Sequence, residues 1–177
     1  MGAPISIAGP TASGKSAVAM KIAEHLKGEI ISVDSMQVYR GLDIGTAKPS
    51  AAEQAAIRHH LIDCAGLEET YDAARYVREA TERETKIERP IFCGGTGLYF
   101  QAWHEGLGDS PQANAEVRAA IEAMDPEARL AELKATDPVM FERIDQKNPR
   151  RVVRALEVIR LTGKPFSQQR QEWQNTV

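Results

Sequence analysis

The sequence predicts an α/β fold, in which a parallel β-sheet is flanked by helices. Three short apolar runs, at residues 5–8, 30–33 and 90–93, stop at glycine, proline or aspartate, as buried parallel strands do. Segments with apolar residues at helical spacing separate the runs, and this alternation is typical of a parallel sheet. The 177 residues are 42% hydrophobic and 27% charged, which allows a sizeable core and excludes a disordered or fibrous protein.

The elements of the first hundred residues follow from spacing and punctuation. Apolar residues recur at helical intervals over 14–26, and Gly28 is placed to cap that helix. Residues 35–50 are rich in glycine and turn formers, which predicts a functional loop. A short extended segment is expected at 61–62, and an amphipathic helix at 71–87 leads into the strand at 90–93.

The rest of the chain is predicted to be mainly helical, with helices near 97–105, 114–123, 127–135 and 149–162. We therefore expect a P-loop α/β core at 1–106, a helical insertion or lid at 107–147, and a basic helix at 148–177 that returns to the core. Three strands make a small sheet, and the chain stops soon after the basic helix. The C-terminal part of the fold is therefore expected to be missing.

Charge is unevenly distributed along the chain. The net charge of −3 excludes a general nucleic-acid coat. Residues 143–170, however, hold eight basic residues against two acidic ones, whereas residues 1–142 carry a net −8. This pattern predicts one anionic ligand bound at one place, and the alternative is a solvated helix face.

The sequence also predicts a cytoplasmic location. No apolar run approaches the roughly 18 residues of a membrane helix, and no signal-peptide pattern opens the chain. Cys64 and Cys93 are too few for a disulfide framework and lack metal-site spacing. We therefore expect a soluble protein in a reducing compartment, with no membrane partner.

A complete phosphate-binding motif, G-x-x-x-x-G-K-[ST], follows the first predicted strand and opens the first helix. Its backbone N–H groups and the helix N-terminus would bind a di- or triphosphate. Lys15 would place a charge on the distal phosphate, and the Ser16 hydroxyl would bind Mg²⁺. The predicted cofactor-binding residues are Gly9, Pro10, Thr11, Ala12, Ser13, Gly14, Lys15 and Ser16.

The motif alone leaves the reaction open, because most such loops bind nucleotides and a small-molecule kinase is the first alternative. Asp34 ends the second strand, at the sheet edge where ligands bind. It could act as a general base, hold Mg²⁺ or cap a helix. Gln37 offers a donor and an acceptor that could read a nucleobase, and Lys48 adds a cation in a second turn.

Six sequence blocks in this order resemble the tRNA dimethylallyltransferase (tRNA isopentenyl transferase) family. They are Gly-Pro-Thr-Ala-Ser-Gly-Lys-Ser at 9–16, Asp-Ser-Met-Gln-Val-Tyr at 34–39, Gly-Thr-Ala-Lys-Pro at 45–49, His-His-Leu-Ile-Asp at 59–63, Gly-Gly-Thr-Gly-Leu-Tyr at 94–99 and Asn-Pro-Arg-Arg-Val-Val-Arg-Ala-Leu-Glu-Val at 148–158. The resemblance implies transfer of a dimethylallyl group from dimethylallyl diphosphate to N6 of the adenosine following the anticodon. The P-loop would then hold a diphosphate leaving group rather than ATP.

The resemblance also implies which residues act. Asp34 becomes the general base, with Thr96 as its catalytic companion. The anticodon stem-loop would be bound by Asp34, Ser35, Met36, Gln37, Thr96, Arg118, Arg150, Arg151, Val152, Val153 and Arg154. Arg151 and Arg154 share one face of the predicted helix, while Val152, Leu156 and Ile159 can pack on another. We expect Mg²⁺ as cofactor and a monomeric protein; a non-catalytic tRNA-binding form is the remaining alternative.

Overall fold

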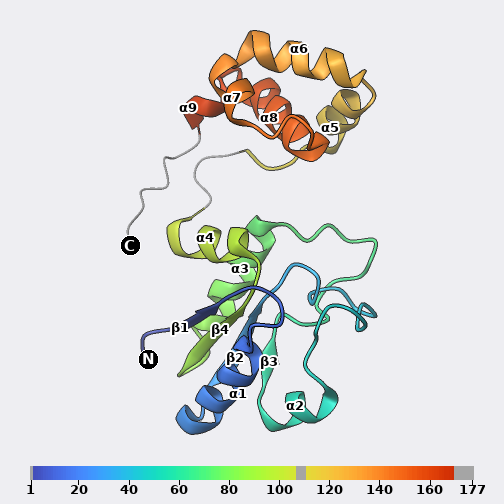
Figure 1. Ribbon diagram of the computed structural model, residues 1–177. Helices are drawn as coiled ribbons and strands as arrows, with labels where there is room; N and C mark the ends of the chain where they lie inside the picture. Colours follow the sequence, from blue (N-terminus) through green and yellow to red (C-terminus); the bar gives the residue numbers. More distant parts are fainter. Residues whose placement is uncertain (1, 107–110, 170–177) are drawn as a thin grey trace. The chain divides into compact units, whose positions relative to one another are not determined.

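The computed structural model describes residues 2–106 and 111–169, which form two units with a boundary between residues 107 and 108 (Figure 1). The first unit holds a parallel sheet of the strands β1 (Ile5–Ala8), β2 (Glu29–Val33), β3 (His59–His60) and β4 (Pro90–Gly94). Their order across the sheet is β1-β4-β2-β3. The predicted α/β class with a parallel sheet is confirmed.

Helices cover both faces of this sheet. Successive strand residues point to opposite sides, and apolar side chains on both sides need to be buried. Ile30, Ile91 and Cys93 pack against α1 (Lys15–Leu26) on one face. Ile31 and Phe92 pack on the other face, with buried side chains from α3 (Ala73–Glu84) and α4 (Gly97–Glu105) (Figure 1). The central strands β2 and β4 are thus buried on both faces, which explains why they are continuous apolar runs in the sequence.

Two local expectations for the first unit were wrong. The extended pairing ends at His60, because Leu61 has a positive φ of 59° and turns the chain. The left-handed residue that closes α1 is Lys27, with φ 52°, rather than Gly28. Gly28 is required for a different reason: a Cβ there would lie 2.7 Å from the Arg89 carbonyl oxygen.

The second unit is helical, as predicted, and is built around α8 (Pro149–Thr162). α8 packs against α5 (Ala115–Glu122) and α6 (Pro126–Thr136). Val152, Leu156 and Ile159 lie in the core of this unit, which confirms the predicted apolar face. The return of segment 148–177 to the α/β core stays a prediction. Parts of the predicted segments, residues 107–110 and 170–177, lie outside the described residues.

Three short helices had no counterpart in the sequence prediction. They are α2 (Ala51–Ala56), α7 (Pro138–Arg143) and α9 (Phe166–Gln169). The start of α2 had a readable signal, because Ser50 and Glu53 form a capping box in which each side chain bonds the other residue's backbone N–H. Among the described residues, no helix combines the length and the apolar character needed to cross a membrane.

Gly94, at the end of the central strand β4, provides a test of this packing. A Cβ at Gly94 would overlap the carbonyl group of Val33 on the neighbouring strand. We expect Gly94→Ala to lower the free energy of unfolding by about 1–3 kcal/mol, measured by denaturant titration. Gly97→Ala is the matched control, because a Cβ at Gly97 would meet no atom of residues 2–106 or 111–169 within 4 Å and alanine favours the helix that begins there. Equal losses in the two variants would contradict the packing argument.

Candidate functional site

Three loops meet at the carboxyl edge of the sheet because the ends of three strands are in register. Ala8 pairs with Gly94, and Gly94 pairs with Val33 on its other side. The loops that follow are joined by backbone hydrogen bonds: Gly9 N–H donates to the Gly94 carbonyl (3.3 Å) and Thr96 N–H to the Val33 carbonyl (3.1 Å). The predicted phosphate loop, the Asp34 loop and the Thr96 loop therefore form one site.

The phosphate loop has the backbone that its motif requires. Gly14 adopts a left-handed conformation (φ 81°) immediately before α1, and Ala12 does so with φ 65°. No side chain of the described residues caps the start of α1, so the first-turn N–H groups could bind an anion. The half-buried Lys15 donates from Nζ to the Pro10 carbonyl (3.1 Å), which folds its side chain back over the loop, and the Ser16 side chain is exposed.

Asp34 caps a turn with one carboxylate oxygen and keeps the other. Its Oδ1 accepts hydrogen bonds from the backbone N–H groups of Met36 (2.8 Å) and Gln37 (3.2 Å). Its Oδ2 has no hydrogen-bond partner among residues 2–106 and 111–169. The capping and the base interpretations of Asp34 are therefore compatible, since each uses a different oxygen.

Thr96 ties the two loops on either side of the site together. Its Oγ1 accepts a hydrogen bond from the Ser35 backbone N–H (2.9 Å) and also lies 3.4 Å from the Ser35 hydroxyl. Ser35 is the residue after Asp34, so Thr96 lies next to the carboxylate-bearing turn although 61 residues separate it from Ser35 in sequence. The structure thus brings the two predicted catalytic residues to one place.

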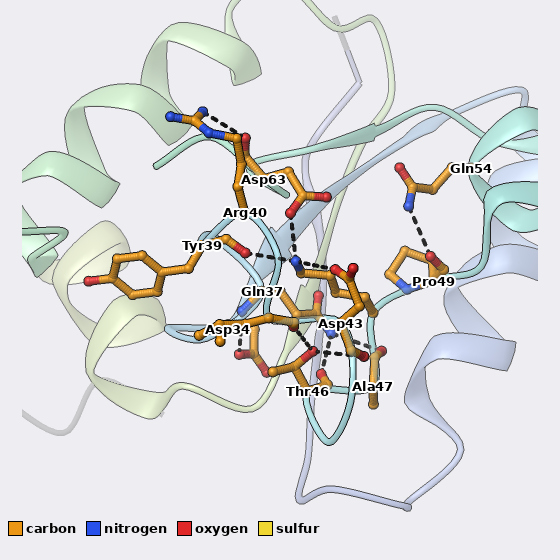
Figure 2. Close-up of polar contacts among 12 residues, drawn as sticks. Asp34, Gln37, Tyr39, Arg40, Asp43, Thr46, Ala47, Pro49, Gln54 and Asp63 are labelled. Atoms are coloured by element: carbon orange, nitrogen blue, oxygen red, sulfur yellow. Dashed lines mark hydrogen bonds and ion pairs between the residues drawn. The ribbon is translucent and has the colours of Figure 1, made fainter. Parts of the chain in front are cut away.

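Gln37 has its side chain occupied within the protein. Its Oε1 accepts from the Ser32 hydroxyl (2.8 Å). Its Nε2 donates to the carbonyls of Thr46 and Ala47 (3.0 Å each) (Figure 2). Both ends of the amide are therefore used to hold the loop. Reading a nucleobase with this amide, as the sequence suggested, would require these bonds to open.

Arg118 and Arg154, predicted to bind tRNA, meet at a buried carboxylate in the second unit. Both guanidinium groups donate to Glu157 Oε2, at 2.9 and 2.8 Å, and the Asn114 N–H donates to Oε1 at 2.8 Å. Glu157 is completely buried, whereas both arginines remain about one-third exposed. Burial alone would raise the pKa of Glu157, but these bonds hold it below the ordinary value of 4.5.

The other residues of the predicted tRNA-binding stretch divide into two kinds. Arg150 and Arg151 are exposed in the first turn of α8 and form no salt bridge with the described part of the chain. Val152 and Val153 are only 3% and 5% exposed and belong to the core of the helical unit. Their side chains pack rather than face solvent, which corrects the expectation that all of 150–154 presents a binding surface.

Sequence reasoning missed two buried polar groups near these residues. One is Glu157, an acid that stands in an otherwise basic and apolar helix. The other is Asp137, which is 1% exposed and accepts hydrogen bonds from the Ser167 N–H (2.7 Å) and hydroxyl (2.7 Å) and the Met140 N–H (3.0 Å). The signal for Asp137 was its position immediately before Pro138, which is typical of a helix N-cap.

These two carboxylates make the helical unit sensitive to acid. Burial opposes the ionised form of both, yet their hydrogen bonds hold the pKa of Glu157 below 4.5 and that of Asp137 below 3.8. A carboxyl group whose pKa is lower in the folded state than in the unfolded state stabilises the fold at every pH above its unfolded pKa. That stabilisation is lost as the pH falls through its folded-state pKa. We expect the free energy of unfolding to decrease as the pH is lowered from 4.5. The decrease should be smaller in Glu157→Gln than in the original protein, and denaturant titrations at each pH measure both.

Fold and site together define an α/β protein in which a G-x-x-x-x-G-K-S loop and Asp34 follow parallel strands that end at the same edge of the sheet. A sequence profile described as IPP transferase matches residues 37–177, so the chain belongs to the IPP transferase family. This confirms the family predicted from the six sequence blocks.

Individual relatives agree with this assignment. The chain is 47% identical to a tRNA dimethylallyltransferase of Hydrogenovibrio crunogenus, over 96% of this chain and 55% of the relative, and 49% identical to one of Halorhodospira halophila, over 97% and 58%. It thus spans little more than half the length of these curated relatives. A full-length tRNA isopentenylpyrophosphate transferase from Bacillus halodurans is a structural neighbour with 42% identity and a TM-score of 0.58, over 92% of this chain and 56% of that one. A eukaryotic dimethylallyltransferase acting on tRNA has 29% identity and a TM-score of 0.76, over 94% and 44%.

Proposed function

We propose that the protein transfers a dimethylallyl group from dimethylallyl diphosphate to N6 of the adenosine that follows the anticodon in tRNA, releasing diphosphate. The names of its relatives support this activity. The observation that supports the proposal is the register of Ala8, Gly94 and Val33, because the loop of residues 9–16 and the turn that bears Asp34 both begin at this edge of the sheet.

Asp34 would supply the proton acceptor. The lone pair of an adenine amine is delocalised into the ring, so the amine needs a base as it attacks carbon. In the transfer, the allylic carbon–oxygen bond breaks, a bond from N6 to that carbon forms, and the N6 proton passes to Asp34. Its Oδ1 is held by two N–H groups, which leaves Oδ2 to take the proton.

The phosphate loop would stabilise the leaving group. Negative charge grows on diphosphate as the carbon–oxygen bond breaks, and preorganised donors stabilise it most where water is excluded. Lys15 and the uncapped N–H groups of α1 are such donors. The Ser16 hydroxyl fits Mg²⁺ bound mainly through diphosphate oxygens, because Mg²⁺ takes few protein ligands at phosphate sites. When bound, the ion would neutralise part of the diphosphate charge.

The basic surface of α8 would position the RNA. Arg150 and Arg151 are exposed cations, and Arg118 and Arg154 present the exposed part of their guanidinium groups beside Glu157. Contacts of this kind bind phosphates and orient the RNA, while the target adenine leaves its stack to reach the catalytic site. We place the protein in the cytoplasm with tRNA and expect a monomer, which light scattering would test.

The direct test supplies an anticodon stem-loop and radiolabelled dimethylallyl diphosphate and measures label in RNA. The control RNA carries inosine in place of the target adenosine, because inosine has no N6 amine. Label in the first RNA alone supports the proposal. Stem-loop binding without transfer would instead identify a non-catalytic tRNA-binding form, and transfer of the ATP γ-phosphate to an acceptor would identify a kinase.

A further inference from the structure

Lys48 lies in the turn after the Asp34 loop and is almost completely buried, with 5% of its side chain exposed. Its Nζ donates to the Tyr39 carbonyl (2.7 Å), the Asp43 carboxylate (2.8 Å) and the Asp63 carboxylate (2.5 Å) (Figure 2). A lysine ammonium has three N–H donors, so all three are used within the protein. Lys48 is therefore not available to hold a phosphate, although its motif places a cation near the site.

The turn that Lys48 anchors is bonded to Gln37. The carbonyls of Thr46 and Ala47, immediately before Lys48, accept both hydrogen bonds from Gln37 Nε2, while Ser32 on β2 holds the other end of the amide. Gln37 is thus clamped between the sheet and the turn. The carbonyl acceptors stay in place only while the turn keeps its conformation, which includes a positive φ of 51° at Ala47.

Gln37 in turn holds Asp34. Its backbone N–H is one of the two donors to Asp34 Oδ1, and its backbone carbonyl accepts from the Asp63 N–H (3.1 Å). Asp63 therefore contacts both Lys48 and Gln37. A continuous series of hydrogen bonds runs from the ammonium of Lys48 to the carboxylate of Asp34.

We propose that Lys48 is a positioning residue that holds the Asp34 carboxylate in place through the 46–47 turn and Gln37. This role rests on the prenyl transfer proposed above. Its ammonium compensates two carboxylates from segments 20 residues apart in sequence, Asp43 and Asp63. Burial alone would lower the pKa of Lys48, but these two bonds raise it, so the cation persists at neutral pH. A misplaced base slows proton abstraction without removing the phosphate or RNA contacts.

The test compares Lys48→Met, which keeps an unbranched side chain of similar shape and removes the ammonium group, with Arg75→Met. Arg75 also bonds two carboxylates, Glu69 and Glu79, but lies on α3 outside the site. We expect Lys48→Met to lower the single-turnover rate constant for prenyl transfer by about 10-fold or more at saturating substrates, with both KM values within about 2-fold of the original. Arg75→Met should leave the rate constant unchanged even if it lowers the melting temperature equally.

Amide hydrogen exchange gives a readout that needs no activity. Exchange at the Met36 and Gln37 amides, which donate to Asp34, should be about 10-fold faster in Lys48→Met and unchanged in Arg75→Met. If the unmodified chain transfers no prenyl group, the proposed function fails while exchange still decides the role of Lys48. Unchanged exchange, or a loss confined to the KM for the allylic diphosphate, would overturn the proposal. If Lys48→Met does not fold, Asp63→Asn removes one of the two ion pairs of Lys48, the one with Asp63, and is judged by the same measurements.

Discussion

Replacing Asp34 by alanine should slow prenyl transfer by about 10²-fold or more, with little change in the affinity for an anticodon stem-loop. The alanine variant loses the oxygen proposed to take the N6 proton and also the acceptor for the Met36 and Gln37 amides. The rate is measured under single-turnover conditions with radiolabelled dimethylallyl diphosphate, and RNA affinity is measured by filter binding.

Asp34→Asn separates the two functions of this side chain. The asparagine carbonyl oxygen can still accept from both backbone N–H groups, as Oδ1 does now, but its amide nitrogen cannot take a proton. The turn should therefore survive, and amide exchange at Gln37 should match the original protein. Transfer should be as slow in Asp34→Asn as in Asp34→Ala. An asparagine variant with full activity would show that Asp34 only shapes the turn.

The parts of this site that were predictable are those set by local sequence. A strand, a glycine-rich turn and a helix start follow one another at 5–16, and each has its own local signal. The placement of Asp34 followed from a general property of parallel sheets, whose carboxyl ends meet at one edge. In the structure, Ala8, Gly94 and Val33 pair at the ends of their strands, so the loops that follow these strands begin at the same edge.

The parts that were not predictable depend on partners far away in the sequence. Lys48 is a cation in a turn when seen alone, and it becomes a buried clamp only because Asp63 approaches from the segment after β3. From the sequence, Gln37 is a candidate to bind a nucleobase, but its side-chain amide forms hydrogen bonds with Ser32 and with the 46–47 turn. A charged residue near a site has no local signal that shows whether it is paired.

The same limit applies to the basic helix. Spacing separated its arginines from its apolar face correctly, yet it could not show that Glu157 points inward and binds two of those arginines. Val152 and Val153 entered the tRNA-binding set because the resemblance implied the whole stretch 150–154, although a helix turns adjacent residues to different sides. Assigning function to a whole helical stretch therefore overstates the number of its binding side chains.

Replacing Lys15 by methionine should lower the rate of prenyl transfer by about 10²–10³-fold, because the variant removes a preorganised cation from the growing charge of the diphosphate. Lys15 differs from Lys48 in how it is bonded, since its Nζ donates to one neutral acceptor, the Pro10 carbonyl, and keeps further donors for a ligand. Calorimetric titration with inorganic diphosphate provides a measurement that does not depend on activity, and it should show weaker binding.

Lys21→Met is the matched control for Lys15→Met, because Lys21 is an exposed lysine on the same helix, α1. The two substitutions change the net charge equally, so any loss from a general change in the protein's field appears in both. We expect Lys21→Met to bind diphosphate and transfer the prenyl group like the original protein. Equal losses in both variants would mean that the helix acts through its overall charge, and the loop would then have no specific lysine contact with the leaving group.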